Sequence, residues 1–142
     1  MKVFNRRAKY DYELLDRFEA GIALMGAEVK AVRAGQAQLT QSHAKIIGNE
    51  AYLLNANIIV PGKKDYKQDR TRKLLLHRQE LNKILSETKA KNLTLIPLKM
   101  YTKGHLIKLE LALAKSKRKS QKRESLKIKD IKRDIERELK ER

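Results

Sequence analysis

FEAGIALMGAEVKAVRAG, residues 18–35, is the stretch that determines the centre of this fold. Up to position 24 apolar side chains fall at every second residue, which is typical of a half-buried strand. Beyond it the period changes, because Val29 and Val32 lie three residues apart and therefore share one side of a short helix. Glu28 falls in the first helical turn, where the dipole favours an acid, and Gly35 is placed to end the helix. Two basic residues lie one turn apart on its exposed face, Lys30 and Arg33.

The composition indicates one small domain that binds a polyanion. The 142 residues suffice for one core and a tail, and 34 Lys and Arg against 17 Asp and Glu give a net charge of +17. Nucleic acid and anionic membrane are the usual polyanions. No apolar run approaches the ~20 residues that cross a bilayer, and the amino terminus lacks the apolar segment of a signal peptide. The lack of Cys fits a cytoplasmic protein. With no Trp and 5% aromatics, a single-strand binder built on aromatic stacking is not expected.

Alternation of apolar and polar residues predicts a mainly β domain. A long strand is expected over residues 12–24, and Gly21 offers a place for it to bend. Two strands should form a hairpin over residues 41–59. Its second strand carries alternating apolar residues expected on one face, Tyr52, Leu54, Ala56 and Ile58. In the strand over residues 93–101, Pro97 lacks an amide hydrogen and should lie at an edge or a bulge.

The rest of the head is predicted to contain one more strand, a helix and a loop. The clearest alternation covers residues 106–113, and apolar residues at helical spacing follow His77 through residue 91. Residues 74–76 form an apolar run that could be a strand or lead into that helix. Residues 63–73 have almost nothing to bury and predict a mobile basic loop. About six antiparallel strands with otherwise unprotected edges suggest a small closed barrel.

A basic tail is expected after the last strand. Between residues 115 and 123 six of nine residues are basic and none is acidic or apolar, and a segment of this composition does not fold alone. Further along the tail, apolar residues recur at intervals of three and four residues. That stripe is too thin to secure a free helix but suits ordering on a partner. The sequence therefore predicts a head, residues 1–114, and a tail, residues 115–142, that is disordered in isolation.

No catalytic or metal-binding constellation is found in the sequence. His43, His77 and His105 stand far apart, with no Cys to complete a metal site. There is no Gly-x-Ser-x-Gly, Walker or paired-carboxylate motif. Acids such as Glu19 and Glu28 can be explained as strand-face or helix-start residues. A binding protein without metal or cofactor is therefore expected rather than an enzyme.

Several blocks of the sequence resemble the SmpB family, in the family's order and over most of the chain: residues 5–12, 18–35, 72–77, 95–101 and 113–115. The resemblance implies a closed antiparallel six-stranded barrel of the oligonucleotide-binding (OB) type, with two or three flanking helices and a basic tail that becomes helical on the ribosome. It also implies a cytoplasmic monomer that binds the tRNA-like domain of transfer-messenger RNA (SsrA RNA). Such a protein delivers that RNA to stalled ribosomes for trans-translation.

The resemblance also implies which residues contact RNA. The acid of the Glu-Ala-Gly block lies in the family's RNA-binding surface, where a carboxylate can accept from a base edge. Otherwise Glu19 would be an exposed strand acid that softens repulsion from Arg17 or Lys30. The candidate RNA-binding residues are Asn5, Arg6, Arg7, Tyr10, Glu19, Lys30, Arg33, Arg72, Lys73, Leu75 and Lys108. The candidates for contact with the ribosome, at its decoding centre and messenger channel, are Lys115, Lys117, Arg118, Lys119, Lys122 and Arg123.

Three positions depart from the family pattern. Gln121 stands where Asp is common, Ser116 where Gly is usual, and Tyr10 where many relatives have His. The positive charge is kept, so binding to phosphate is still expected. The alternative function is that of a ribosomal protein whose basic extension lies in ribosomal RNA, and an RNA-processing enzyme is the least expected.

Overall fold

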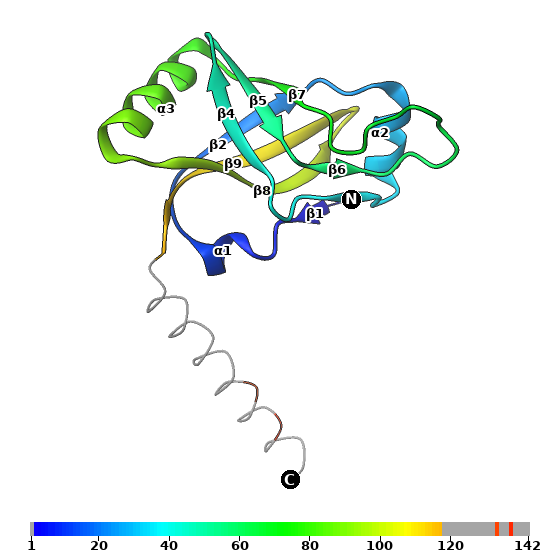
Figure 1. Ribbon diagram of the computed structural model, residues 1–142, viewed down its shortest axis with the longest axis horizontal. Coiled ribbons are helices and arrows are strands. Elements are labelled where there is room, and N and C mark those ends of the chain that lie inside the picture. Colours follow the sequence, from blue (N-terminus) through cyan, green and yellow to red (C-terminus); the bar gives the residue numbers. More distant parts are fainter. Residues whose placement is uncertain (1, 118–132, 134–136, 138–142) are drawn as a thin grey trace.

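Nine strands and three helices make up the described part of the chain in this computed structural model, residues 2–117, 133 and 137 (Figure 1). In chain order they are β1 (Lys2–Phe4), α1 (Ala8–Asp11), β2 (Tyr12–Ile22), α2 (Gly26–Arg33), β3 (Ala37–Gln38), β4 (His43–Ile47), β5 (Glu50–Leu54), β6 (Asn57–Ile58), β7 (Arg72–Leu75), α3 (Arg78–Lys91), β8 (Thr94–Lys103) and β9 (Leu106–Ser116).

Six of the strands pair in a closed ring. Their order is β8, β4, β5, β7, β2 and β9, and β9 pairs back onto β8. Every pairing between the described strands is antiparallel. β1 pairs with the second half of β8, along the same edge as β4, while β3 and β6 form a separate two-stranded sheet. Five of the ring strands lie where the sequence predicts strands. The sequence leaves the sixth, β7, open between a strand and the start of a helix, and it assigns Arg72 and Lys73 to the basic loop. The periodicity misses β1, α1 and β3 because each has only two to four residues, and it extends the second hairpin strand over β6.

The long strand β2 is irregular near its start. Its register with β9 shifts between Leu14 and Arg17, where three steps along β2 match two steps along β9. One extra residue of this kind is a β-bulge, which bends a strand and increases its twist. Beyond the bulge, β2 pairs in regular register with β9 and with β7, so no register shift marks Gly21.

The hairpin of β4 and β5 turns at Gly48, whose φ of 61° is in the left-handed region that glycine tolerates. The predicted face of the second strand is wrong in its first half, because Ala51 and Leu53 are the buried residues. Asn55, at a φ of 62°, then interrupts the strand and shifts the alternation, so that Ile58 is buried as expected. The two residues that the sequence places on the wrong face are half-buried, Tyr52 and Leu54.

The helix expected after His77 is confirmed as α3, and the structure decides the run over residues 74–76, which the sequence left open between a strand and the start of a helix. Residues 74–76 belong mainly to β7, α3 lays Ile84 onto the core, and Asn92 ends α3 in the left-handed conformation at a φ of 53°. The register of β8 with β9 shifts between Pro97 and Lys99, which is the bulge expected at a proline. The largest fully buried apolar side chains of the main core are Leu39, Leu53, Ile58, Ile84, Met100, Leu109, Leu111 and Leu113. Each such burial contributes roughly 1.5–3 kcal/mol.

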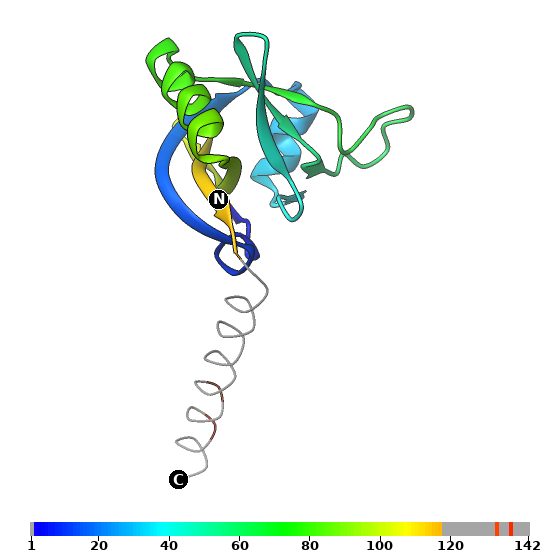
Figure 2. The same ribbon diagram turned by 60° about the vertical axis from the view of Figure 1, so that its left-hand side comes forward.

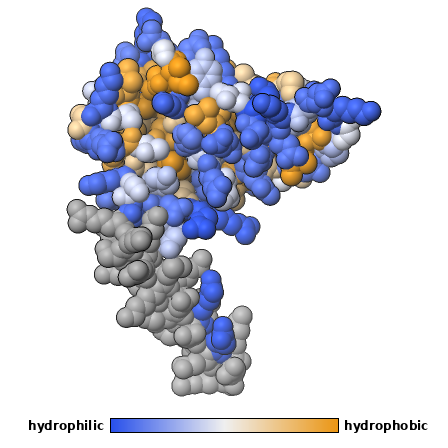
Figure 3. All heavy atoms as spheres, in the orientation of Figure 1, coloured by the Kyte–Doolittle hydropathy of each residue, from blue (hydrophilic) through white to orange (hydrophobic). Residues whose placement is uncertain are grey.

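Outside the core the head is largely polar. Figure 3 shows a mostly hydrophilic face with an apolar area between α3 and the β4–β5 hairpin. That area corresponds to a shallow groove lined by Ile46, Leu81 and Leu85. Turning the molecule shows the loop between β6 and β7 extending away from the ring on the side of α2 (Figure 2). The ring therefore leaves its strand faces, α2 and this loop open to a partner.

Candidate RNA-binding surface

Four of the expected RNA-binding residues meet around one groove. Glu19, Lys73, Leu75 and Lys108 line a cavity of about 500 Å³ where β7, β2 and β9 run side by side. Gly21 brings them together because it pairs with Leu75 on one neighbouring strand and with Lys108 on the other. Leu75 is 57% exposed. The groove thus combines an exposed apolar side chain with groups that can bind phosphate and base edges.

Glu19 is held in place by hydrogen bonds rather than lying free on its strand. It accepts from the Tyr101 hydroxyl and, at 3.2 Å, from the Lys103 ammonium. These two bonds lower the pKa of Glu19, while burial and the bond to Glu19 raise the pKa of Tyr101 to about 12. Arg17, expected as a neighbour of Glu19, instead pairs with Glu110 at 3.2 Å. Glu19 is thus ionised at neutral pH, and its side chain is 41% exposed, so it can still accept from a base.

Lys73 is paired on the protein surface. Its ammonium lies 3.0 Å from a Glu50 carboxylate oxygen, and Glu50 also accepts from the Tyr52 hydroxyl at 2.7 Å. The hydrogen bonds from Tyr52 and Lys73 lower the pKa of Glu50, and the bond from Tyr52 has the larger effect. An exposed pair of this kind adds little to stability, because solvent screens its charges. Lys73 can therefore leave Glu50 for a phosphate at little cost.

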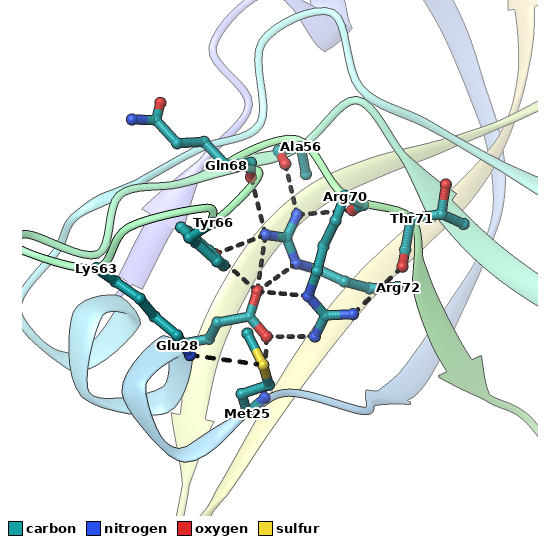
Figure 4. Close-up of polar contacts among 9 residues, drawn as sticks. All are labelled: Met25, Glu28, Ala56, Lys63, Tyr66, Gln68, Arg70, Thr71 and Arg72. Carbon is teal, nitrogen blue, oxygen red and sulfur yellow. Dashed lines mark hydrogen bonds and ion pairs between the residues drawn. The ribbon is translucent and has the colours of Figure 1, made fainter.

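A buried ion-pair network joins α2 to β7 (Figure 4). Glu28 is fully buried and accepts from both Arg70 and Arg72, from the Tyr66 hydroxyl at 2.8 Å, and from the Met25 amide at 2.9 Å. Burial alone would raise the pKa of Glu28. The hydrogen bonds from Arg70, Met25, Tyr66 and Arg72 outweigh burial and lower it to about 2. The carboxylate is therefore ionised throughout the neutral range and fixes four separate groups.

Arg72 is a correction to the predicted RNA-binding set. Its side chain is 0% exposed, and its guanidinium donates to Glu28 at 2.8 and 2.9 Å and to the carbonyl oxygens of Ala56, Gln68 and Arg70 at 2.6 to 3.0 Å. A guanidinium enclosed in this way cannot contact RNA. Its function here is structural, because a buried charge is stable only when paired and hydrogen-bonded.

The predicted mobile loop is also anchored by this network. Tyr66 and Arg70, both within residues 63–73, point inward to Glu28. Lys64 and Lys67 of the same loop are exposed. Sequence reasoning missed this arrangement because it explained Glu28 as a helix-start acid. The only local signal was the spacing of Arg72, two residues before a buried leucine and hence on the same strand face.

The amino-terminal candidates form a second group, around α1 at the other end of β2. The Asn5 side-chain amide donates to the Pro97 carbonyl at 2.9 Å and so fastens the segment to β8. Arg7 lies 3.6 Å from the Asp11 carboxylate and 5.4 Å from the centre of the Tyr10 ring. The other member of the group, Arg6, is exposed. The structure therefore divides the predicted set between two areas of the head.

The candidates of α2 lie beside the first group. Lys30 is exposed, and the Arg33 guanidinium donates to the His105 carbonyl at 3.3 Å. His105 belongs to the turn between β8 and β9, two residues after Lys103. Arg33 therefore joins the end of α2 to the turn that leads into β9, the strand that carries Lys108.

The start of the tail is attached to the head. Lys115 lies in β9 opposite Glu13. Lys117 donates its backbone amide to the Asp11 carbonyl at 3.0 Å and its ammonium to the Lys9 carbonyl at 2.7 Å. The other four expected ribosome contacts lie outside the described residues, Arg118, Lys119, Lys122 and Arg123.

In the described ranges of the chain, no group of three or more His, Cys, Asp or Glu residues could hold a metal ion. In the same ranges, no helix is long and apolar enough to cross a bilayer.

Comparison with known proteins identifies the family. The family model described as SmpB protein matches residues 2–141. The SsrA-binding proteins of Gloeobacter violaceus and Acaryochloris marina are each 46% identical over 140 residues, which cover 96% of this chain and 92% and 91% of the relatives. A chain of the solved structure "tmRNA-SmpB: a journey to the center of the bacterial ribosome" is similar with a TM-score of 0.69 and 42% identity, covering 88% of this chain and 94% of that one. This chain therefore belongs to the SmpB protein family.

Proposed function

We propose that this protein binds the tRNA-like domain of transfer-messenger RNA and delivers that RNA to stalled ribosomes for trans-translation. The observation that carries the proposal is the meeting of Glu19, Lys73, Leu75 and Lys108 around one groove. The SsrA-binding relatives and the tmRNA-SmpB structure support the choice of RNA. The net charge of +17 supports binding to a polyanion.

In this proposal the head is an OB-type barrel, which the closed ring of six antiparallel strands supports. Its basic face holds the RNA backbone through shape and phosphate contacts, while Glu19 and Leu75 touch bases or ribose. The exposed cations of α2, Lys30 and Arg33, extend this face. Arg72 acts indirectly, because it holds β7 and thereby Lys73 and Leu75 in place.

The tail, residues 115–142, has a separate role. Its basic residues bind ribosomal RNA phosphates at the decoding centre and in the messenger channel, where the tail becomes helical. A messenger in that channel excludes the tail, so the tail reports a ribosome that has run out of template. The ribosome performs the chemistry. The protein itself acts as a binding protein, a monomer in the cytoplasm, and not as an enzyme.

A truncation separates the two roles. β9 runs to Ser116, and Lys117 is hydrogen-bonded to α1, so the chain should end after Lys117 rather than after Ala114. We expect the truncated protein to bind a transcript of the tRNA-like domain with nearly full affinity but to support no peptide tagging on stalled ribosomes. Full-length Lys108→Ala is the matched control, with weakened RNA binding and an intact tail.

Two outcomes would contradict the proposal. If truncation reduced RNA affinity and peptide tagging equally, the head and the tail would not have the separate roles proposed here. A flat dependence of RNA affinity on salt would exclude backbone recognition, because displacing counterions from several phosphates makes binding fall steeply with salt. Sequencing the RNA that co-purifies with the protein tests the partner. One small stable RNA should dominate, whereas ribosomal RNA alone would favour the ribosomal-protein alternative.

A further inference from the structure

A second groove lies directly beside the first. It has a volume of about 180 Å³, and its lining includes Gly21, Val29, Leu75, Leu106 and Lys108. The first groove shares Gly21, Leu75 and Lys108 with it. Leu75 therefore stands as a ridge between two adjoining depressions of one surface.

The apolar character of this place is unusual for so polar a head. Leu75 and Leu106 are 57% and 59% exposed, among the most exposed of the large apolar side chains in the described residues. Gly21 leaves room for Leu75, because a Cβ on Gly21 would lie 3.3 Å from the Leu75 Cβ. Two exposed leucines on one small area indicate a contact site rather than scattered surface residues.

The charges around the second groove indicate what occupies it. Lys108 lines the groove, and Arg33 is hydrogen-bonded at 3.3 Å to the carbonyl of His105, another lining residue. The net charge of +17 repels a second copy of the chain. An occupant therefore needs an apolar face for the leucines and negative charge for the cations, and an unstacked nucleotide has both.

We propose that the second groove holds one unstacked nucleotide of the bound RNA. Leu75 and Leu106 lie against its base or ribose, and Lys108 and Arg33 lie near its phosphates. This inference rests on the proposed function and adds Leu106, with the turn between β8 and β9, to the RNA-binding surface.

The test compares Leu106→Ala with Ile47→Ala, a matched truncation of a side chain that is 52% exposed on the β4–β5 hairpin. We expect Leu106→Ala to weaken binding of the tRNA-like transcript roughly tenfold, the effect of losing part of one apolar contact. Its salt dependence should match the wild type, because no charge has changed. Ile47→Ala should bind like the wild type. Leu106→Phe keeps an apolar face and should restore binding.

Each outcome of this test decides the inference. Equal affinity of Leu106→Ala and Ile47→Ala would overturn it, and so would a Leu106→Phe variant as weak as Leu106→Ala. A wild-type protein that self-associates through Leu106 without RNA, seen by sedimentation, would also overturn it. If the wild type fails to bind the transcript at all, the proposed function itself fails, which is a distinguishable result.

Discussion

Replacing Glu28 with Gln should destabilise the head more than any other single change to its charges. The substitution keeps the shape of the side chain but removes the negative charge that Arg70 and Arg72 share. Arg72 is 0% exposed, so its guanidinium would stay buried without a counter-ion. A Gln amide also presents an NH₂ group, which repels the surrounding donors.

The size of the effect follows from the pKa of Glu28. A decrease from the ordinary value of 4.5 to about 2 corresponds to about 3 kcal/mol, at about 1.4 kcal/mol for a tenfold change in proton affinity. Removing one partner of a buried pair independently costs roughly 3–5 kcal/mol. Because the pKa is lowered in the folded state, this stabilisation is complete above pH 4.5 and is lost as the pH falls toward 2.

Urea unfolding followed by circular dichroism gives the measurement. At pH 7 the free energy of unfolding of Glu28→Gln should be about 3 kcal/mol below that of the wild type. By pH 3 the difference should shrink to less than half, because the unfolded wild type, whose Glu28 carboxyl has the ordinary pKa of 4.5, then binds a proton that the folded protein does not. Glu50→Gln is the control. It breaks an exposed pair with Lys73 and should lower the free energy of unfolding far less than Glu28→Gln does. A Glu28→Gln protein within 1 kcal/mol of the wild type at pH 7 would refute this reasoning.

Two other substitutions test local features of the structure. Gly21→Ala places a Cβ 3.3 Å from the Leu75 Cβ, so Leu75 must shift by a few tenths of an ångström. We expect RNA affinity, measured by filter binding, to fall several-fold. The free energy of unfolding in urea should change by under about 1 kcal/mol. Unchanged affinity would mean that the position of Leu75 is not critical. Asn92→Ala at the left-handed end of α3 should lower the free energy of unfolding by about 1 kcal/mol, whereas Asn92→Gly should not; equal effects of the two would exclude backbone strain as the cause.

Much of the ring could be predicted because its signals are local. β2, the β4–β5 hairpin, α3 and β9 each carry a clear apolar period, and Pro97 marks its own bulge by chemistry that does not depend on neighbours. The errors arise where a single residue changes the phase. Asn55 in the left-handed conformation resets the alternation after Leu53. An asparagine in a sequence does not by itself predict that conformation, because most asparagines do not adopt it.

The resemblance to the SmpB family, and not a local pattern, put Glu19, Lys73, Leu75 and Lys108 in the candidate set. The structure brings these four residues together because three neighbouring strands pair in register. The buried network was missed because it joins distant segments. The pairing of Glu28 with Arg72 joins residues 44 positions apart. No local period of apolar residues indicates such a contact. A strongly basic chain also contains many cations that could pair with one acid.

The buried network also explains how a strongly charged head can present an ordered binding surface. Glu28 lies in the first turn of α2, which carries Lys30 and Arg33. It holds Arg72 at the start of β7, three residues before the exposed Leu75 paired with Gly21. The two elements that border the grooves are therefore fixed to each other through one carboxylate. The side chains of this surface are ordered when the protein folds, so their conformational entropy is not lost on RNA binding. A rigid surface therefore binds more tightly than a mobile one that makes the same contacts. The cost of burying Glu28 and Arg72 is thus met during folding, and cations such as Lys30 and Lys73 stay on the surface, where RNA can reach them.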